Sequence, residues 1–367
     1  MGWIIGLGII ALAIFLFLRL NPQFGGRISA ADKARFAQSP QWDGKKFVNQ
    51  TETSLGISLG DIPGLLRQQF AKAPGRAPQK PIKMVKFDSE AWDSKPDQPA
   101  FIWYGHSALL LRLNSKTLLI DPMLGPDAAP IAPIASKRYN QNSLALIDQL
   151  PQIDLLLMTH DHYDHLDYAS IKRLQGKVDQ YFVALGVGRH LRRWGIDMSK
   201  VTEFDWWDEQ PFSDISVRFT PSRHFSGRGL TDRAKSLWGG WIFKTEAHNI
   251  YWSGDGGYEA HFQEVGERFG PFDWAFMECG QYNQLWHPIH MFPEESVQAA
   301  REAGAKRAFP VHWGGFTLAL HDWTDPVLRF VAEAEKQQLP ISTPRPGEMV
   351  CLGEEKDVEP WWEAVEA

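Results

Sequence analysis

Short runs of apolar residues separated by polar turns fill the chain between residues 101 and 352. Runs of this kind are typical of buried strands. Two pairs of them flank short polar turns, which predicts two β-hairpins. Each hairpin ends in an aspartate and is followed by one further apolar run. The first half contains 108–113, 117–120, Asp121 and 153–158, and the second half contains 241–244, 250–252, Asp255 and 272–277.

The second half also contains a predicted helix followed by another strand. Residues 293–303 begin with Pro293, carry acids in the first turn and are followed by Gly304, which is typical of a helix. Residues 308–311 form the next apolar run. Strands mixed with helices and duplicated once predict an α/β (α+β) fold. We expect two sheets packed face to face with helices outside them, a four-layer αββα sandwich.

The first 18 residues contain no charged side chain and are mostly Ile, Leu, Ala and Phe. This length is close to the roughly 20 residues that span a bilayer as a helix, so we expect an N-terminal transmembrane helix. A cleaved signal peptide is the alternative, although no Lys or Arg precedes the apolar stretch. Basic residues follow the span, which predicts a single-pass protein of the cytoplasmic (inner) membrane with its body facing the cytoplasm.

Changes in composition along the chain predict four segments. We expect an anchor at 1–20, a Pro- and Gly-punctuated connector at 21–95, the folded domain at 96–352 and a C-terminal tail at 353–367. The connector includes a basic stretch whose apolar residues recur at helical spacing. It either lies on an anionic leaflet or packs on the domain as an ordinary helix. Its basic residues are Arg67, Lys72, Arg76, Lys80, Lys83 and Lys86, and its apolar ones Ile62, Leu65, Leu66 and Phe70.

Composition excludes some partners and leaves others open. The net charge of −6 argues against nucleic acid as a partner. Two cysteines cannot form a disulfide framework. The 16 tryptophans indicate either an aromatic core or anchors at a membrane interface. A homodimer is left open.

The segment from Thr159 to Asp167 concentrates candidate metal ligands. Three histidines and two aspartates fall within the six residues 160–165, and this donor set suits Zn²⁺ or a similar divalent ion. In extended backbone His160 and His162 leave the same face. Asp164 and His165 follow at once and can turn to a second position. One strand end can therefore supply ligands to two ions.

Three further donors each follow a predicted strand: His224, Asp255 and His312. If these strand ends converge, two three-ligand sites result, with Asp255 as a bridge between the ions. A structural, hydrogen-bonded role is the alternative for each residue taken singly. The first site is expected to contain His160, His162 and His224, and the second Asp164, His165 and His312.

The segment His160–His165 resembles the H-x-H-x-D-H signature of the metallo-β-lactamase superfamily, and the later donors follow in the order that superfamily uses. Further segments are similar to the N-acyl-phosphatidylethanolamine-hydrolysing phospholipase D group. The resemblance covers roughly residues 90–350 and implies two Zn²⁺ per chain and a membrane phospholipid substrate. These segments are Trp103–Ser107, Asp121–Pro122, Thr220–His224, Leu237–Trp241, Ser253–Tyr258 and Val311–Gly314.

The implied reaction releases N-acylethanolamine and phosphatidic acid, with a hydroxide held between the metals as nucleophile. Asp164 and His290 are the expected catalytic residues. His290 is the candidate general acid, with helix capping or phosphate binding as its alternatives. His106 and Asp121 are expected to orient ligands, or else to be a core histidine and a turn residue. Ile289 stands where the family has Gln, which puts phosphate recognition beside His290 in doubt.

Two other functions remain open at this point. The same fold could hydrolyse a soluble lactone, a sugar phosphate or a nucleotide phosphodiester. A metal-stabilised membrane scaffold is the non-enzymatic alternative. Purely structural zinc sites usually have four protein ligands each, whereas each ion here has three terminal ligands and a shared one. The expected ligand set therefore favours an enzyme.

Overall fold

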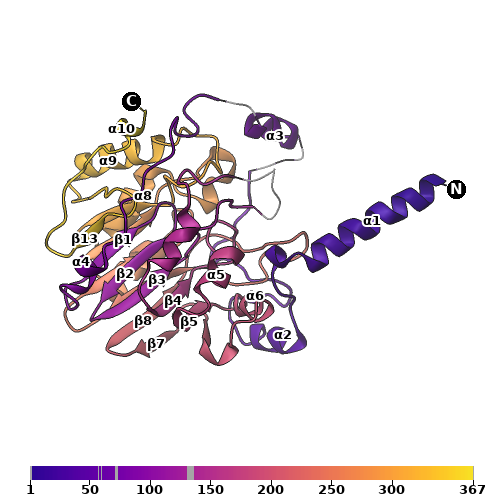
Figure 1. Cartoon of the computed structure of the whole chain (residues 1–367), viewed down its shortest axis with the longest axis horizontal. Coiled ribbons are helices and arrows are strands. Elements are labelled where there is room, and N and C mark those ends of the chain that lie inside the picture. The colour runs from indigo at the N-terminus through magenta and orange to yellow at the C-terminus, as the bar shows by residue number, and fades with distance from the viewer. Residues whose placement is uncertain (1, 57, 59, 71–72, 130–135, 367) are drawn as a thin grey trace.

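The computed structural model describes residues 2–56, 58, 60–70, 73–129 and 136–366, and its centre is a pair of β-sheets (Figure 1). The first sheet has the strand order β13-β1-β2-β3-β4-β5-β6, and the second β12-β11-β10-β9-β8-β7. The first comprises β1 (Ala100–Trp103), β2 (Leu109–Leu113), β3 (Lys116–Ile120), β4 (Ile153–Met158), β5 (Val178–Ala184), β6 (Val201–Phe204) and β13 (Met349–Cys351). The second comprises β7 (Glu209–Phe212), β8 (Ile215–Thr220), β9 (Gly240–Lys244), β10 (Asn249–Trp252), β11 (Trp274–Glu278) and β12 (Ala308–Val311).

Aromatic side chains join the two sheets. Phe101 on β1 has its ring centroid 5.1 Å from that of Trp274, 4.8 Å from that of Phe276 and 4.7 Å from that of Phe309, all edge to face. Edge-to-face contact is a favourable geometry for aromatic pairs. All four rings are buried, so the core lies between the sheets.

Helices cover the outer faces of both sheets and complete the predicted αββα sandwich (Figure 1). On the second sheet α8 packs against β11, and the neighbouring helices α7 and α9 pack against α8. On the first sheet α6 lies beside β6. The helices of the domain are α5 (Tyr168–Leu174), α6 (Gly188–Arg193), α7 (His261–Phe269), α8 (Pro293–Glu302) and α9 (Asp325–Gln337).

Both predicted hairpins form, as β2–β3 and β9–β10, and each is antiparallel. The first turns through Asn114 and Ser115, whose φ angles are 46° and 58°. Two consecutive left-handed residues match the right-handed twist of the flanking strands. The strand expected at 272–277 occupies Trp274–Glu278, and the helix expected at 293–303 is Pro293–Glu302.

Parallel pairing brings the polar residues that follow the strands to one edge of the sandwich. β3, β4 and β5 are parallel neighbours in the first sheet, as are β10, β11 and β12 in the second. Three of the predicted site residues have left-handed backbone although none is glycine: His106, Asp121 and His312 (φ 57°, 41° and 66°). Such conformations cost about 1–3 kcal/mol each and concentrate at functional sites. This edge is therefore the candidate site.

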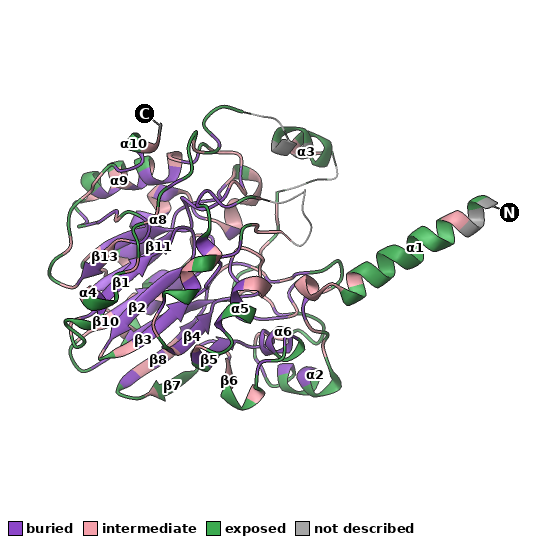
Figure 2. Cartoon of the chain, viewed as in Figure 1, coloured by how far each residue is buried: buried purple, intermediate pink, exposed green. Residues whose placement is uncertain are grey.

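The N-terminal apolar stretch forms α1 (Gly2–Leu20), which projects away from the sandwich (Figure 1). Most of its described side chains are exposed, as the green ribbon of Figure 2 shows. None of the helices in the described ranges combines the length and apolar character required to cross a bilayer. The expected transmembrane helix is therefore not confirmed.

The connector between α1 and the domain packs partly into the core. Phe36 and Phe47 are buried within the hydrophobic core. The basic stretch was expected to form a basic surface. Arg76 does not contribute to it, because its side chain is buried and donates to the Ala319 carbonyl. Lys72 lies outside the described residues. The helices here are α2 (Ala30–Phe36), α3 (Ile62–Phe70) and α4 (Ser89–Asp93).

Tryptophan is a core residue in this chain. Six of the largest fully buried side chains are Trp92, Trp238, Trp241, Trp252, Trp274 and Trp313. The expected C-terminal tail ends in α10 (Glu363–Glu366), and just before it Trp361 stacks on Trp313 with ring centroids 5.4 Å apart. The division of the chain into four segments stays a prediction.

Candidate metal centre

The first predicted triad consists of three imidazoles that come together at the ends of β4 and β8. His160 Nε2 lies 2.9 Å from His162 Nδ1, and His224 Nε2 lies 3.1 Å from the same atom. These three nitrogens lie within 4.8 Å of one another, so they can face a single ion. His160 and His224 are buried and His162 is half-buried, which leaves this side of the triad open to a cleft.

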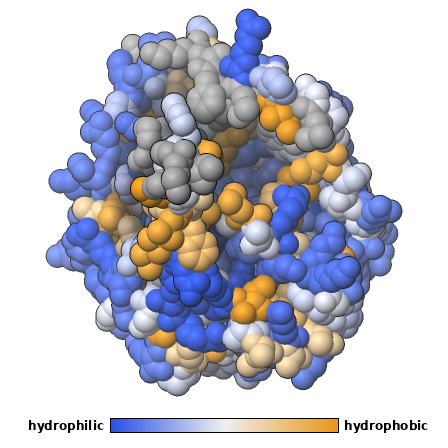
Figure 3. Space-filling model, turned by 90° about the vertical axis from the view of Figure 1, so that its right-hand side faces the viewer, coloured by the Kyte–Doolittle hydropathy of each residue, from blue (hydrophilic) through white to orange (hydrophobic). Residues whose placement is uncertain are grey.

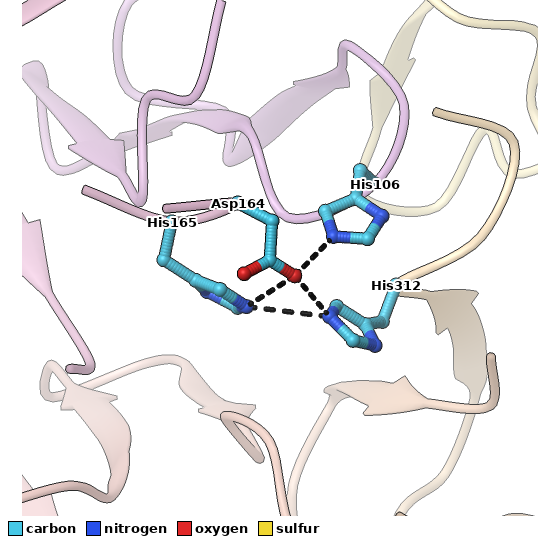
Figure 4. A group of neighbouring side chains, drawn as sticks. All are labelled: His106, Asp164, His165 and His312. Carbon is cyan, nitrogen blue, oxygen red and sulfur yellow. Dashed lines mark hydrogen bonds and ion pairs between the residues drawn. The ribbon is translucent and has the colours of Figure 1, made fainter. Parts of the chain in front are cut away.

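The second predicted triad joins the loop after β4 to the end of β12. His165 Nε2 lies 3.3 Å from His312 Nε2. Asp164 Oδ2 lies 3.2 Å from His312 Nε2 and 3.7 Å from His165 Nε2. Figure 4 shows these three side chains pointing toward one another, with His106 beyond Asp164.

Asp255 lies between the two triads, after β10. Its Oδ2 is 3.0 Å from His165 Nε2 and 3.1 Å from His312 Nε2. The same oxygen is 3.9 Å from His160 Nε2 and 3.9 Å from His224 Nε2. A single carboxylate thus reaches both sets of donors, as expected of a bridging ligand.

Two further predicted residues contact the ligands directly. Asp121 Oδ2 lies 2.9 Å from His165 Nδ1, while its Oδ1 accepts the Thr159 N–H at 2.8 Å. His106 Nε2 lies 2.8 Å from Asp164 Oδ2. Contacts of this kind set the tautomer and orientation of metal ligands. The seven predicted ligands and the two residues expected to orient them therefore lie at or around one centre; their roles stay predictions.

Sequence reasoning missed the groups that hold His224. Its Nδ1 lies 3.0 Å from the carbonyl oxygen of Ile289, which leaves Nε2 facing the first triad. Its backbone N–H donates to Asn49 Oδ1 at 3.1 Å, and Asn49 Nδ2 donates to its carbonyl at 2.9 Å. Ile289 thus contributes through its backbone at the position where the side chain departs from the family pattern. Nothing local in the sequence marks Asn49.

The protonation of the two triads differs because their neighbours differ. Burial, followed by the neighbouring imidazoles, lowers the pKa of His160 and of His224 well below the ordinary value. Burial lowers the pKa of His162 to about 4. Burial opposes protonation of His312 as well, but Asp255 and Asp164 outweigh it and raise its pKa to about 10.

These protonation states fit divalent cations. A metal-binding imidazole must be neutral, and the first triad supplies neutral rings near pH 7. The second triad gathers buried carboxylates that attract positive charge, which a divalent cation supplies in place of protons. His-rich ligand sets with carboxylates suit zinc and related first-row metals. The residues present therefore fit a metal pair.

His290 lies between the triads on the cleft wall. Its ring centroid is 4.9 Å from that of His224 and 5.4 Å from that of His312. Glu278 at the end of β11 is fully buried, and its Oε2 lies 3.0 Å from His290 Nδ1. Glu278 also accepts the Met291 N–H at 3.0 Å. Sequence reasoning missed Glu278. An acidic residue at the end of an apolar strand could have indicated it as a candidate site residue.

A buried polar network supports the loop that carries four of the ligands. Asp161, between His160 and His162, accepts from Ser236 Oγ at 2.6 Å and lies 3.0 Å from His190 Nε2. Arg228 donates to the carbonyl oxygens of Asp161 at 2.8 Å and Leu166 at 2.6 Å. Groups from distant segments thus form hydrogen bonds with the polar groups of this tight turn.

An open cleft of about 290 Å³ gives access to both triads. Its polar wall includes donors from each triad together with His290. Its other wall is mainly apolar. The lining comprises Leu55, His162, Asp164, Phe225, Asp255, Gln281, Trp286, Ile289, His290, His312 and Leu318. A molecule with both a polar and an apolar part fits such a surface.

The family profile described as "Beta-lactamase superfamily domain" matches residues 116–313, a range that contains both triads and Asp255. The chain belongs to the metallo-β-lactamase superfamily. An uncharacterized protein of Mycobacterium tuberculosis is 34% identical over 347 residues, which cover 93% of this chain and 92% of that protein.

The chain is also similar to a relative named as a phospholipase D and to a solved structure. The N-acyl-phosphatidylethanolamine-hydrolyzing phospholipase D 1 of Caenorhabditis elegans is 31% identical over 233 residues, covering 60% of this chain and 65% of that one. A solved metallo hydrolase from Ignicoccus hospitalis superposes with a TM-score of 0.53 at 21% identity, covering 69% of this chain and 98% of that one, and shows the shared fold. The chain is a metal-dependent hydrolase of the metallo-β-lactamase fold.

Proposed function

We propose that the chain is a membrane-associated, di-zinc phosphodiesterase that cleaves N-acyl-phosphatidylethanolamine. Water adds to phosphorus, the bond from phosphorus to the ethanolamine oxygen breaks, and N-acylethanolamine and phosphatidic acid leave. The observation that carries the proposal is the shared Asp255, which joins two donor triads at the floor of a partly apolar cleft. The similarity to the phospholipase D of Caenorhabditis elegans supports this substrate.

A bound pair of zinc ions would supply an activated water and would take up charge on the phosphoryl oxygens. The chain's own groups would do the rest. Asp164, fixed by its contact with His106, lies on the cleft wall where it can orient the attacking water by a hydrogen bond. His290 lies on the same wall, with Nδ1 against Glu278, so its Nε2 is the nitrogen placed to protonate the departing ethanolamine oxygen.

The position of α1 supports a substrate that stays in the bilayer. Arg228 donates through Nη1 to the carbonyl of Asp161 in the ligand loop, and through Nε to the carbonyl of Gln23 at the base of α1. The C-terminal end of the apolar helix therefore lies at the same edge of the sandwich as the cleft. In this proposal α1 inserts in the inner leaflet and holds the cleft close to its lipid substrate.

The test uses protein purified in mild detergent and mixed micelles that contain N-acyl-phosphatidylethanolamine, with products followed by mass spectrometry. We expect release of N-acylethanolamine and phosphatidic acid, and we expect a chelator to stop it. His162→Ala should abolish turnover because it removes a donor from the first triad. His248→Ala is the matched control, since His248 lies on the β9–β10 turn, at the opposite ends of those strands from Asp255.

Absence of product from protein shown to contain metal would overturn the lipid substrate. The same preparation would then be assayed with a soluble phosphodiester and with lactones, which the superfamily fold also accommodates in principle. Full activity of the His162→Ala variant would overturn the assignment of the centre itself. Equal loss in the His248→Ala variant would indicate a folding defect rather than chemistry.

A further inference from the structure

A second hollow, separate from the metal cleft, lies at the base of α1. It has a volume of about 490 Å³. Four arginines line it, of which Arg189 is buried. The other three come from three different segments: Arg19 at the end of α1, Arg27 in the following linker and Arg193 at the end of α6. Phe15 and Leu18 of α1 form its apolar side.

These last three arginines are exposed and their charges are available. Within the described ranges, no carboxylate forms an ion pair with any of them. Arg193 donates from Nη2 to the carbonyl oxygens of Arg19 at 2.9 Å and Leu20 at 3.2 Å. This contact satisfies two carbonyls at the C-terminal end of α1 and offsets the partial negative charge there.

One acidic residue, Asp232, also lines the hollow, and it is already engaged. It accepts the backbone N–H of Gly229 at 2.6 Å and that of Arg228 at 3.2 Å. It also lies 3.8 Å from the buried guanidinium of Arg189. The carboxylate therefore serves the loop around it, and the surface of the hollow keeps a positive charge.

Exposed apolar side chains continue from this basic hollow along α1, away from the sandwich. Along α1, Leu7, Ile10 and Ile14 are 67%, 58% and 54% exposed. Leu230 on the neighbouring loop is 83% exposed. Figure 3 views the molecule from the side to which α1 projects, and shows hydrophobic side chains gathered beside hydrophilic ones. Basic residues beside an apolar helix match the boundary between lipid headgroups and acyl chains.

We propose that the hollow formed by Arg19, Arg27 and Arg193 binds the phosphate headgroup of an anionic phospholipid. This inference deepens the proposed function and rests on its membrane part, but it concerns a site other than the metal centre. The arginines provide charge-assisted hydrogen bonds to phosphate oxygens. Phe15, Leu18 and the exposed Leu230 provide contact for acyl chains, which free phosphate lacks. An anionic lipid is therefore the ligand that uses the whole surface.

The test measures cosedimentation of the full chain with vesicles of phosphatidylcholine, with and without phosphatidylglycerol. We expect tighter binding to the vesicles that contain phosphatidylglycerol. Each exposed arginine near an anionic surface should contribute about five-fold in affinity. The variant R19Q/R27Q/R193Q should therefore lose on the order of a hundred-fold of the binding to anionic vesicles. All three side chains are exposed, so the variant is expected to fold.

The matched control is K244Q/R301Q/K336Q, which removes the same number of positive charges from exposed positions on β9, α8 and α9. It should keep the preference for phosphatidylglycerol. Excess inorganic phosphate at constant ionic strength should leave vesicle binding unchanged, because it cannot use the apolar walls. Displacement by inorganic phosphate would overturn the lipid as the ligand.

The inference is wrong if the unchanged chain binds both kinds of vesicle equally, or if the triple arginine variant keeps its preference. Hydrolysis of N-acyl-phosphatidylethanolamine in neutral detergent micelles is measured on the same samples. Both variants should hydrolyse it at the unchanged rate. If the unsubstituted chain prefers phosphatidylglycerol vesicles but does not hydrolyse N-acyl-phosphatidylethanolamine, the proposed reaction is contradicted. The proposed lipid site at the three arginines would then still hold.

Discussion

Asp121 Oδ2 lies 2.9 Å from His165 Nδ1, and both side chains are buried at the edge of the sandwich. The second carboxylate oxygen accepts the Thr159 N–H, so the carboxylate is itself fixed by the backbone. The His165 ring can therefore turn only Nε2 toward Asp255 and His312. A residue 44 positions before His165 thus sets the direction of this ligand.

Asp121→Asn should weaken metal binding. The amide keeps the size of the side chain but removes the charge that orients His165, and such changes behind a ligand typically cost about 10–100-fold in metal affinity. Metal content after dialysis against a weak chelator measures this. Asp154→Asn is the control, because Asp154 on β4 accepts the Thr117 N–H at 2.9 Å but lies away from the metal centre. Unchanged metal affinity in Asp121→Asn would contradict the orienting role.

The shared position of Asp255 predicts different metal contents for two variants. His224→Ala removes a donor from the first triad alone and should leave one ion per chain. Asp255→Ala removes the oxygen that reaches both triads and should lose both ions. Elemental analysis of the purified proteins gives these ratios, and His248→Ala should match the unchanged chain. Loss of both ions in His224→Ala would show that the triads do not bind independently.

Acid should destabilise the metal-free protein through buried histidines. Burial lowers the pKa of His261 on α7 to about 3, below the ordinary value of about 6.5 for an exposed imidazole. Between these values the unfolded chain binds more protons than the folded one. The free energy of unfolding therefore falls as the pH falls through this window, by up to about 1.4 kcal/mol per pH unit for each such group.

His261→Gln should reduce this pH dependence. Urea unfolding of the chelated protein at a series of pH values gives the slope of the free energy of unfolding against pH. The variant should lose the contribution of one proton below pH 6.5. Above that pH the variant and the unchanged chain should run in parallel, which serves as the internal control. An identical slope in acid would mean that His261 is not buried in its neutral form.

The fold could be predicted because its signals are local. Apolar runs, polar turns and the proline before α8 each act within a few residues, and they placed the strands of both hairpins. The candidate ligands could also be identified from the sequence. The cluster at His160–His165 is contiguous, and each of the other three candidates follows a recognisable strand. Boundaries shifted by a residue or two where pairing with a neighbour decides the end of a strand, as at Glu278, which pairs with Val311.

The supporting groups could not be predicted, because their partners are remote in sequence. Asn49 and His224 are separated by 175 positions, and Arg228 and Gln23 by 205. No periodicity connects such residues; only the packed fold does. Within the basic stretch, the burial of Arg76 could not be predicted for the same reason, since its partner is the carbonyl oxygen of the distant Ala319.

Phe101→Ala tests whether the junction between the sheets carries stability independently of the metal centre. Phe101 contacts Trp274, Phe276 and Phe309 of the opposite sheet, so truncation removes three aromatic contacts and leaves a cavity. Substitutions of this kind cost about 3–5 kcal/mol. Urea unfolding measures the loss, and Leu328→Ala on α9 is the control, because that side chain is 50% exposed and should change stability by less than about 0.5 kcal/mol.

The same variant tests whether packing between the sheets affects metal binding. Phe101 lies on β1, and neither that strand nor β13, its neighbour at the sheet edge, supplies a predicted ligand. We therefore expect the folded fraction of Phe101→Ala to keep its full metal content. Loss of metal at urea concentrations where the variant is still folded would show that the spacing between the sheets itself sets the ligand geometry. That outcome would assign β1 a part in holding His165 and His312 at their separation of 3.3 Å.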